Sequence, residues 1–473
     1  MKKKFYITTA IDYVNASPHL GHALEKIQAD VIARYQRIKG KDVFFLTGTD
    51  ENSLKNVRAA KELGILTEDL VNKNAARFYQ LKEALNLSFD DFIRTTQERH
   101  KKGVQKFWLA IKKDIYKKKY RGLYCVGCEE FYKEEELENG LCPEHKIKPE
   151  IVEEENYFFA LSKYQKILKN VIEKGEIEIV PESRKIEVLS FIEKGLEDIC
   201  ISRSVERAHG WGIEVPGDKT QIVWVWLDAL SNYITAIDYG EDGEKFKKYW
   251  PADLHLIGKG ISRFHCIYWP AFLISAKLPL PKMVFVHGYI TVGGQKMSKS
   301  LGNVVDPFSL VEKFGTDALR YFLLREASPF EDIDFTFEKL KKRYNDDLAK
   351  GLGNLVARII SLAEKFKIQK PKEIQDKILK NNLEITQKKW KENLERFQFN
   401  EALKVIFDFI SFCDKFINEK RPWEERNQKF ILDLLFALDS ISELLSPFLP
   451  KTAEKILFQI ETRKKEILFP KIE

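Results

Sequence analysis

The chain has 473 residues, of which 44% are hydrophobic and 32% are charged, with a net charge of +7. It is too long for a single hydrophobic core, so we expect two to four packed units. The mild positive charge permits an anionic partner but does not require one. The most apolar stretch, 430–450, contains three acidic residues, and the N-terminal lysines are not followed by the apolar core of a signal peptide. We therefore expect a cytoplasmic protein without a membrane span.

Strand and helix patterns alternate in the first part of the chain. Residues 3–11 predict a strand, 17–37 a helix and 42–50 a second strand, which together indicate a parallel α/β sheet. The sequence pattern changes at 120–152, where short aromatic segments and three cysteines occur. Strand-like runs then return at 221–230, 254–260 and 283–292. The sheet is therefore predicted to be split by an insertion.

The last third of the chain reads as helical. After Phe335 the apolar spacing predicts four long helices, over 346–368, 374–396, 400–419 and 428–446. No internal repeat and no Pro-rich or Ser-rich linker interrupts the chain, so the units should pack closely.

The stretch SPHLGHALEK, residues 17–26, stands where the first predicted helix begins. Ser17 is a good N-cap, and Pro18 suits the first helical position. The N–H groups of such a helix start lack helical partners, and the helix dipole is positive there. We expect this end to attract phosphate.

Two histidines of this stretch, His19 and His22, are three residues apart and should share one helix face. Gly21 between them would let a ligand approach the backbone. The pair could hydrogen-bond phosphate oxygens and stabilise the charge that develops on them. For an isolated HxxH, an ordinary helix start with two unremarkable histidines is the alternative.

A second segment, GGQKMSKSLGN (293–303), follows a predicted strand. Lys296 and Lys299 place two cations close together, and Ser298 adds a hydrogen-bond donor. Lysines can stabilise the charge on a polyphosphate leaving group without a covalent step. A solvated basic loop is the alternative for this segment taken alone.

HLGH near the N-terminus and KMSKS some 280 residues later resemble the paired signatures of class I aminoacyl-tRNA synthetases. Longer segments are similar to methionyl-tRNA synthetases, among them FYITTAIDYVNASPHLGHA, FFLTGTDE, GLYCVGCEEFY, WLDALSNYI and NEKRPWE. The similarity extends from about Phe5 to about Pro450. It implies a Rossmann-like α/β parallel-sheet catalytic domain, split by a zinc-knuckle insertion and followed by an all-α anticodon-binding bundle.

The resemblance also divides the chain into five functional parts. They are the first half of the catalytic domain (1–115), the insertion (116–210, with the knuckle at about 120–150), the second catalytic half (211–290), the KMSKS loop with a stem-contact region (291–345), and the anticodon-binding domain (346–473).

The implied activity is the ligation of L-methionine to tRNA(Met). Methionine first attacks Mg-ATP to give methionyl-adenylate and pyrophosphate, and the acyl group then passes to the terminal ribose of the tRNA. We expect no protein nucleophile, and catalysis by positioning and charge stabilisation. His19, His22, Lys296 and Lys299 are the implied catalytic residues, and Gly21 and Ser298 complete the ATP site.

Methionine is apolar, unbranched and polarizable, so its pocket should be aromatic. The family's pocket corresponds here to Ile11, Tyr13, Trp226, Ala229, Tyr233 and His265. Asp50 matches the aspartate that holds the α-ammonium group, and Arg203 matches an arginine near that acid.

CVGC (125–128) supplies one pair of possible metal ligands, two cysteines, and CPEH (142–145) supplies a second pair, a cysteine and a histidine. Cys125, Cys128, Cys142 and His145 suit a tetrahedral Cys3His zinc site, which would be structural because no fourth position is open. Cys200, Cys266 and Cys413 are scattered and are expected to be buried hydrophobic residues.

The helical part contains three residues that match the family's readers of the CAU anticodon. Asn354 and Arg358 are four residues apart, on one helix face, and Trp423 follows Pro422 at a predicted helix junction. Unpaired RNA bases are commonly read by stacking on aromatic rings and by hydrogen bonds to their edges. Taken alone, a tryptophan in a helical bundle is more often core.

Several positions depart from the family pattern. Ala10 and Asp12 replace Pro and Tyr beside the pocket, and Asn52 and Ser53 replace the usual His-Gly. Gly260 replaces an aspartate associated with the adenosine ribose, so either another residue, such as Glu214, substitutes or activity is lower. The chain ends without the appended domain that makes some members dimers, so we expect a monomer.

Two other functions stay open at this stage. One is a non-catalytic tRNA-binding paralogue, which Gly260 favours and the intact HLGH and KMSKS segments disfavour. The other is a different class I synthetase, such as the cysteinyl enzyme, in which zinc should surround the substrate instead of forming a closed knuckle.

Overall fold

The computed structural model describes residues 2–144, 146–297, 302–326, 328–366, 373–425 and 427–473. The chain forms two compact units. Unit 1 comprises Met1–Pro18, Gln36–Gln80 and Ser88–His287, and unit 2 comprises His19–Tyr35, Leu81–Leu87 and Gly288–Glu473. Among the described residues, no helix is both long enough and apolar enough to cross a membrane.

A seven-stranded sheet forms the centre of unit 1. Its order is β2-β3-β1-β13-β14-β8, with β4 also paired to β3, and the pairs are parallel. The strands are β1 (Lys4–Thr9), β2 (Asp12–Tyr13), β3 (Asp42–Asp50), β4 (Asp91–Arg94), β8 (Glu178–Val180), β13 (Leu254–Gly258) and β14 (Met283–His287). Eight of the nine residues of β3 are buried, as expected for a strand covered on both faces. The predicted split sheet is confirmed, because β1 pairs with both β3 and β13.

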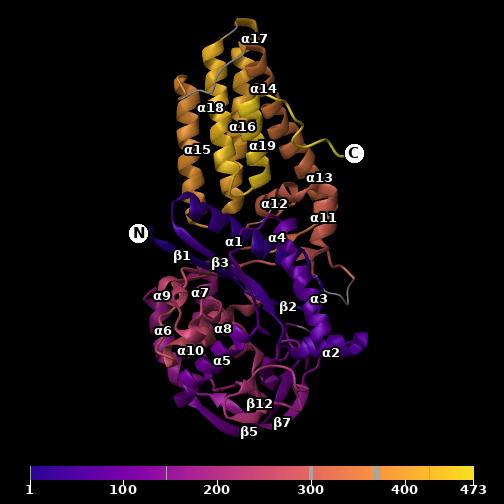
Figure 1. Ribbon diagram of the computed structural model, residues 1–473, viewed down its shortest axis with the longest axis vertical. Helices are drawn as coiled ribbons and strands as arrows, with labels where there is room; N and C mark the ends of the chain where they lie inside the picture. The colour runs from indigo at the N-terminus through magenta and orange to yellow at the C-terminus, as the bar shows by residue number, and fades with distance from the viewer. Residues whose placement is uncertain (1, 145, 298–301, 327, 367–372, 426) are drawn as a thin grey trace. The chain divides into compact units, whose positions relative to one another are not determined.

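The helices of unit 1 pack against this sheet or within the insertion (Figure 1). They are α2 (Leu54–Leu63), α3 (Thr67–Tyr79), α5 (Glu98–Ile111), α6 (Gln165–Glu173), α7 (Glu182–Glu193), α8 (Val225–Thr235), α9 (Glu244–Tyr249) and α10 (Trp269–Ser275). The prediction of a strand over 221–230 is wrong beyond Val223, because α8 begins at Val225. Every residue of α8 is buried, and a fully buried helix shows the same unbroken apolar run as a buried strand.

Two small antiparallel sheets lie between the two halves of the central sheet in the sequence. One has the order β6-β5-β7-β9, and the other β10-β12-β11. Their strands are β5 (Ile115–Cys125), β6 (Glu130–Tyr132), β7 (Glu150–Phe159), β9 (Ile199–Cys200), β10 (Ser202–Ser204), β11 (Glu214–Val215) and β12 (Asp218–Val223). The basic strand β5 lies in register with the acidic β7, so that Lys119 faces Glu155 and Arg121 faces Glu153.

Unit 2 is mainly helical. It contains most of α1 (Leu20–Ile38), then α4 (Leu81–Ala84), α11 (Pro307–Phe314), α12 (Thr316–Arg325), α13 (Phe337–Arg343), α14 (Asn354–Phe366), α15 (Lys377–Glu395), α16 (Phe399–Lys420), α17 (Pro422–Glu425), α18 (Gln428–Leu445) and α19 (Pro450–Thr462). A π-helical stretch, Tyr344–Gly353, leads into α14. Three short strands, β15 (Ile290–Val292), β16 (Gln295–Lys296) and β17 (Ile333–Asp334), form a further sheet. The four long helices predicted after Phe335 are confirmed, and they run beside one another with α19 (Figure 1).

One buried arginine joins the start of the chain to its end within unit 2. Arg320 on α12 is fully buried and lies 2.8 Å from Asp30 of α1. Its other N–H groups donate to the backbone carbonyls of Leu85, Pro447 and Phe448. A buried guanidinium is tolerated only when its donors are satisfied in this way. This cluster fixes α1 against α12 and the end of α18.

Candidate functional site

The two predicted phosphate-binding segments lie next to each other in unit 2. The N–H of Leu20 donates to the carbonyl of Val305 at 3.0 Å, so the start of α1 is joined to the segment that follows KMSKS. Met297 is buried, and its Cε would lie 3.8 Å from a Cβ placed on Gly21. Two stretches that are some 280 residues apart in the sequence are therefore brought together. Ser298 and Lys299, and the side chain of Lys296, lie outside the described residues.

The start of α1 differs from the prediction. The helix begins at Leu20, so His19 and not Ser17 precedes its first turn. The backbone N–H groups of residues 19–22 all have acceptors. His19 donates to Nδ1 of His22 at 3.0 Å, Gly21 donates to Nδ1 of His19 at 3.1 Å, and His22 donates to the carbonyl of His19 at 3.0 Å. The expectation of unpaired N–H groups at this terminus is therefore wrong, because the histidine rings themselves cap it.

This capping fixes the tautomer of both histidines. An Nδ1 that accepts a backbone N–H carries no proton, so a neutral ring holds its proton on Nε2. Burial, together with the positive charge of Lys26 one turn along the helix, lowers the pKa of His22 to about 3. The two rings stack with centroids 3.7 Å apart. The pair therefore presents Nε2–H groups as hydrogen-bond donors, and His22 does so without a charge.

Gly21 is required by the same arrangement. A Cβ at this position would lie 2.9 Å from Cε1 of His19. The glycine thus makes room for the His19 ring, where the sequence suggested only the approach of a ligand.

Five aromatic side chains of unit 1, which we call the aromatic pocket, come from β2, α8 and the turn after β13. Tyr13 meets Trp226 edge to face at 6.4 Å, and Trp226 stacks on Phe264 with centroids 3.6 Å apart. The hydroxyl of Tyr233 lies 2.6 Å from Nε2 of His265. The Nδ1 of His265 lies 3.0 Å from the Ile261 carbonyl, which can only accept, so Nε2 of a neutral ring accepts the Tyr233 proton.

The remaining predicted pocket residues lie on the same elements. Ala229 stands between Trp226 and Tyr233 on one face of α8, and Ile11 packs against the same apolar cluster. The sequence did not single out Phe264, which has no motif of its own. A π-helical turn, Phe264–Tyr268, carries Phe264 and His265.

Asp50 lies beside this pocket at the carboxyl end of β3. It pairs in register with Tyr13 of the parallel strand β2, which places the two side chains next to each other. Asp50 is 3% exposed, and within the described part of the chain its Oδ1 has no hydrogen-bond partner. Burial, and then the neighbouring carboxylates of Asp228 and Glu129, raise the pKa of Asp50 well above its ordinary value. A buried carboxylate with one unpartnered oxygen is suited to receive a ligand cation.

Two cations lie close to the acidic group formed by Asp50, Glu129 and Asp228. The ammonium of Lys55 lies 4.1 Å above the ring of Tyr13. Arg203 is 7% exposed and donates to the carbonyls of Ser202 (2.6 Å) and Glu129 (3.2 Å). Arg203 is thus bonded to the backbone of Glu129, one of the acids beside Asp50. Glu214, the suggested substitute for the residue missing at Gly260, is exposed on β11.

The three predicted cysteine ligands cluster within the insertion. The sulfurs of Cys125, Cys128 and Cys142 lie within 4.8 Å of one another, and those of Cys128 and Cys142 are 3.4 Å apart. This spacing and donor set could hold a metal ion. His145 lies outside the described residues. The cluster is joined to the aromatic pocket, because Nε1 of Trp226 donates to the carbonyl of Cys128 at 3.1 Å.

The predicted anticodon residues lie on two helices of unit 2. Asn354 is exposed at the start of α14, and Arg358 follows one turn later. Arg358 donates to Asp414 and, at 2.7 Å, to Asn418, both on α16. Trp423 on the short α17 is 39% exposed, so it is not a core tryptophan.

Comparisons with known proteins agree with this architecture. A family model described as "tRNA synthetases class I (M)" matches residues 5–149 and 135–360, and one described as "Anticodon-binding domain of tRNA ligase" matches 376–472. The chain is 43% identical over 480 residues to a methionine–tRNA ligase of Thermotoga maritima, covering 98% of this chain and 76% of the relative. It is 42% identical over 473 residues to that of Brucella suis, covering 96% of this chain and 91% of the relative. A solved structure of Mycobacterium tuberculosis methionyl-tRNA synthetase in complex with methionyl-adenylate matches with a TM-score of 0.91 at 40% identity, over 96% of this chain and 93% of that one.

Proposed function

This chain belongs to the methionyl-tRNA synthetase family, and on that premise we propose that it ligates L-methionine to tRNA(Met) in two steps. A carboxylate oxygen of methionine attacks the α-phosphorus of ATP, and the bond to the β-phosphate breaks, which gives methionyl-adenylate and pyrophosphate. A hydroxyl of the terminal ribose of the tRNA then attacks the acyl carbon, and AMP leaves. The observation that carries the proposal is the register pair of Tyr13 and Asp50, which places an aromatic wall beside a buried carboxylate whose Oδ1 has no partner among the described residues.

In this proposal the aromatic pocket takes the thioether side chain of methionine. Trp226 and Tyr13 offer polarizable faces, with Ile11 and Ala229 as small apolar walls and Tyr233 and His265 at the polar end. Asp50 receives the α-ammonium group. The attraction of opposite charges in a buried site offsets the cost of ionising this carboxyl.

The chemistry at phosphorus needs positioning and charge stabilisation more than proton transfer. His19 and His22 donate from Nε2–H to phosphate oxygens, and the backbone capping keeps both donors oriented. Lys296 and Lys299 add positive charge near the leaving pyrophosphate, with Ser298 as a further donor and Gly21 giving the space for His19. Mg²⁺ enters with ATP and shares the phosphate charge.

We propose zinc for the cysteine cluster, with His145 as the fourth ligand. Three sulfurs within 4.8 Å of one another fit the soft, tetrahedral preference of this ion. When bound, it would supply a fold-stabilising cross-link and no reaction step. The protein's own part is to hold the cluster against Trp226 through the Cys128 carbonyl. Metal analysis of the purified protein should give about one zinc per chain, and removal by a chelator should lower the melting temperature.

For the tRNA, we propose that Asn354, Arg358 and Trp423 read the anticodon. The 39% exposure of Trp423 supports a stacking role. The division of the chain into five functional parts, expected from the sequence, stays a prediction. Cytoplasmic location and a monomeric state also stay predictions.

Amino-acid-dependent exchange of pyrophosphate into ATP, run with each of the twenty amino acids in the absence of tRNA, tests this function. Exchange with methionine alone is expected. Exchange with another amino acid would refute the pocket assignment. No exchange from folded, metal-loaded protein would favour the non-catalytic tRNA-binding paralogue, for which Gly260 is the specific observation.

A further inference from the structure

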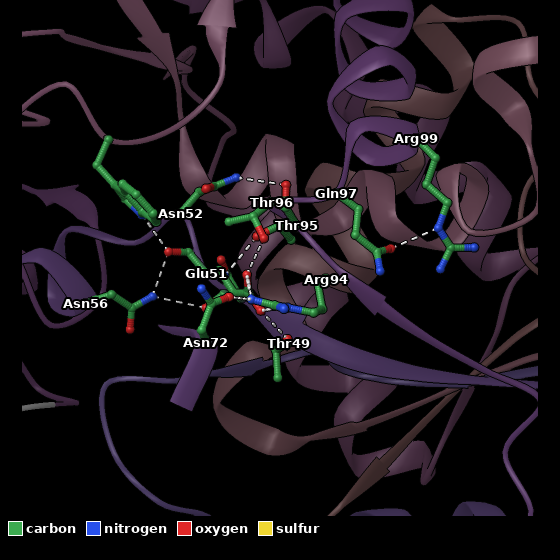
Figure 2. Close-up of polar contacts among 12 residues, drawn as sticks. Thr49, Glu51, Asn52, Asn56, Asn72, Arg94, Thr95, Thr96, Gln97 and Arg99 are labelled. Carbon is green, nitrogen blue, oxygen red and sulfur yellow. Dashed lines mark hydrogen bonds and ion pairs between the residues drawn. The ribbon is translucent and has the colours of Figure 1, made fainter. Parts of the chain in front are cut away.

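The loop that follows Asp50 is held by an unusual number of side-chain bonds. Glu51 is fully buried, and its carboxylate accepts from Nε of Arg94 (2.6 Å), Nη2 of Arg94 (3.1 Å), Oγ1 of Thr49 (2.9 Å) and Oγ1 of Thr96 (Figure 2). Its backbone N–H donates to Oγ1 of Thr95 at 2.8 Å. The residue on the C-terminal side of Asp50 is therefore rigid.

The next two residues, Asn52 and Ser53, join this loop to two other parts of unit 1. The Asn52 amide donates to the carbonyl of Thr95 at 3.2 Å (Figure 2). It also donates to Oδ2 of Asp228 at 2.8 Å. The Ser53 hydroxyl accepts the N–H of Lys55 at 3.0 Å, which caps α2, and donates to the carboxylate of Glu129. These two side chains thus reach α8 and the cysteine insertion, respectively.

The anchor of Asn52 is itself fixed. The other oxygen of Asp228 lies 2.5 Å from Nε2 of His100, and Nδ1 of His100 lies 2.7 Å from Oγ1 of Thr235. Asp228, His100 and Thr235 are all fully buried. Asp228 and Thr235 lie on α8, the helix that also carries Trp226, Ala229 and Tyr233. Asn52 therefore links the Asp50 loop to the helix that forms one wall of the aromatic pocket.

This linkage matters because the Asp50 carboxylate is held only in part, by a backbone hydrogen bond from Asn52 and by the charge of Lys55. Its Oδ1 is buried without a partner in the described part of the chain, and Asp228 and Glu129 repel its charge. Without restraints, the loop would lower its energy by turning the carboxylate toward water. Asn52 and Ser53 bind the same two acids that repel Asp50, so they oppose that movement and give both acids a hydrogen-bond donor.

We propose that Asn52 and Ser53 are positioning residues that hold the Asp50 carboxylate beside Tyr13 in the geometry that receives the α-ammonium group of the substrate. The inference rests on the proposed function and goes beyond it, because it assigns a role to two side chains that lie outside the aromatic pocket. A displacement of about 1 Å at such a site can cost up to about 100-fold in rate.

The test compares two ligands that differ in the ammonium group. L-Methioninol carries the thioether, a terminal hydroxyl and the ammonium group, and 4-(methylthio)-1-butanol carries the thioether and the hydroxyl but lacks the ammonium group. Dissociation constants for both are measured by isothermal titration calorimetry on the full, metal-loaded chain. In Asn52→Ala, methioninol binding is expected to weaken about tenfold, whereas binding of the butanol changes less than about twofold. Ser53→Ala should show the same pattern, about threefold for methioninol.

Two further variants complete the design. Asn52→His restores an N–H donor for Asp228 and is expected to keep methioninol binding within about threefold of the wild type. Asn382→Ala is the matched control, because the one bond that its side-chain amide makes to a described residue goes to the Ile378 carbonyl of its own helix, α15. This variant should change neither constant.

Equal losses for both ligands in Asn52→Ala would mean a merely structural role and would overturn the inference alone, as would unchanged binding of both. If the wild type bound neither ligand and gave no methionine-dependent exchange, the proposed function would fall and this inference with it.

Discussion

The aromatic pocket and the proposed anticodon residues are two binding regions built in opposite ways. Around Asp50, neighbouring side chains are buried and cross-linked, so the proposed methionine-binding residues are held in place. Asn354 and Trp423 are instead exposed, and the Arg358 guanidinium is bonded to Asp414 and Asn418. A small amino acid offers few contacts, so its site must be preorganised. An RNA loop offers stacking bases and many phosphates, so its site needs accessible aromatic and basic groups.

The largest effect is expected at the preformed phosphate donors. His22→Ala should lower the rate of methionine-dependent pyrophosphate exchange about 10³-fold, because one oriented donor to the phosphates is lost. His22→Gln can place an amide N–H near the former Nε2 position and should recover part of this loss. Because the pKa of His22 is about 3, its ring stays neutral at working pH. The pH dependence of the exchange rate checks this role. It would be contradicted if the wild-type profile showed an ionisation that the profile of His22→Gln lacks.

Asp50→Asn should separate function from stability. Loss of the charge should weaken methionine binding about 100-fold. The raised pKa of Asp50 means that its ionised form is disfavoured in the folded chain, so folding is opposed increasingly as pH rises above the ordinary pKa of an aspartate. The variant should therefore melt at a higher temperature than the wild type at pH 8, with a smaller difference near pH 4. Thermal unfolding across this pH range measures the effect, and a lower melting temperature at pH 8 would refute it.

A moderate effect, confined to tRNA, is expected at Trp423. Trp423→Ala should lower kcat/KM for aminoacylation of tRNA(Met) about 10- to 100-fold, which is the range for losing the stacking of one or two bases. Pyrophosphate exchange without tRNA should stay unchanged. Phe458→Ala on α19, which removes another exposed aromatic ring of the same unit, is the control. A comparable loss of tRNA charging in the control would argue against a specific role for Trp423.

The smallest effect is expected at Asp414, and it tests whether the ion pair with Asp414 competes with RNA for the Arg358 guanidinium. Asp414→Asn removes the negative charge beside this guanidinium and should lower KM for tRNA about two- to threefold, since exposed ion pairs contribute little. A rise in KM would show instead that Asp414 orients Arg358. The proposed RNA-binding region would then be preorganised, as the region around Asp50 is.

The sequence by itself determined the elements and the chemistry at short range. Strand β3 has the predicted bounds, Asp42–Asp50, because a continuous apolar run closed by polar residues suffices to define it. The spacing of Cys125, Cys128 and Cys142 likewise indicated a cluster that could bind a metal, since metal ligands are set by local turns. Family resemblance supplied the pocket residues, which composition alone would not have revealed.

Only the tertiary structure decided what depends on contacts between distant parts of the chain. The run after Val223 became a helix because α8 is buried on all sides, and the start of α1 moved to Leu20 because the His19 and His22 rings cap it. The pairing of Tyr13 with Asp50, and the bonds from Asn52 to Asp228 and from Ser53 to Glu129, join residues up to 176 positions apart. Such contacts follow from register and packing, and no local pattern of residue types encodes them.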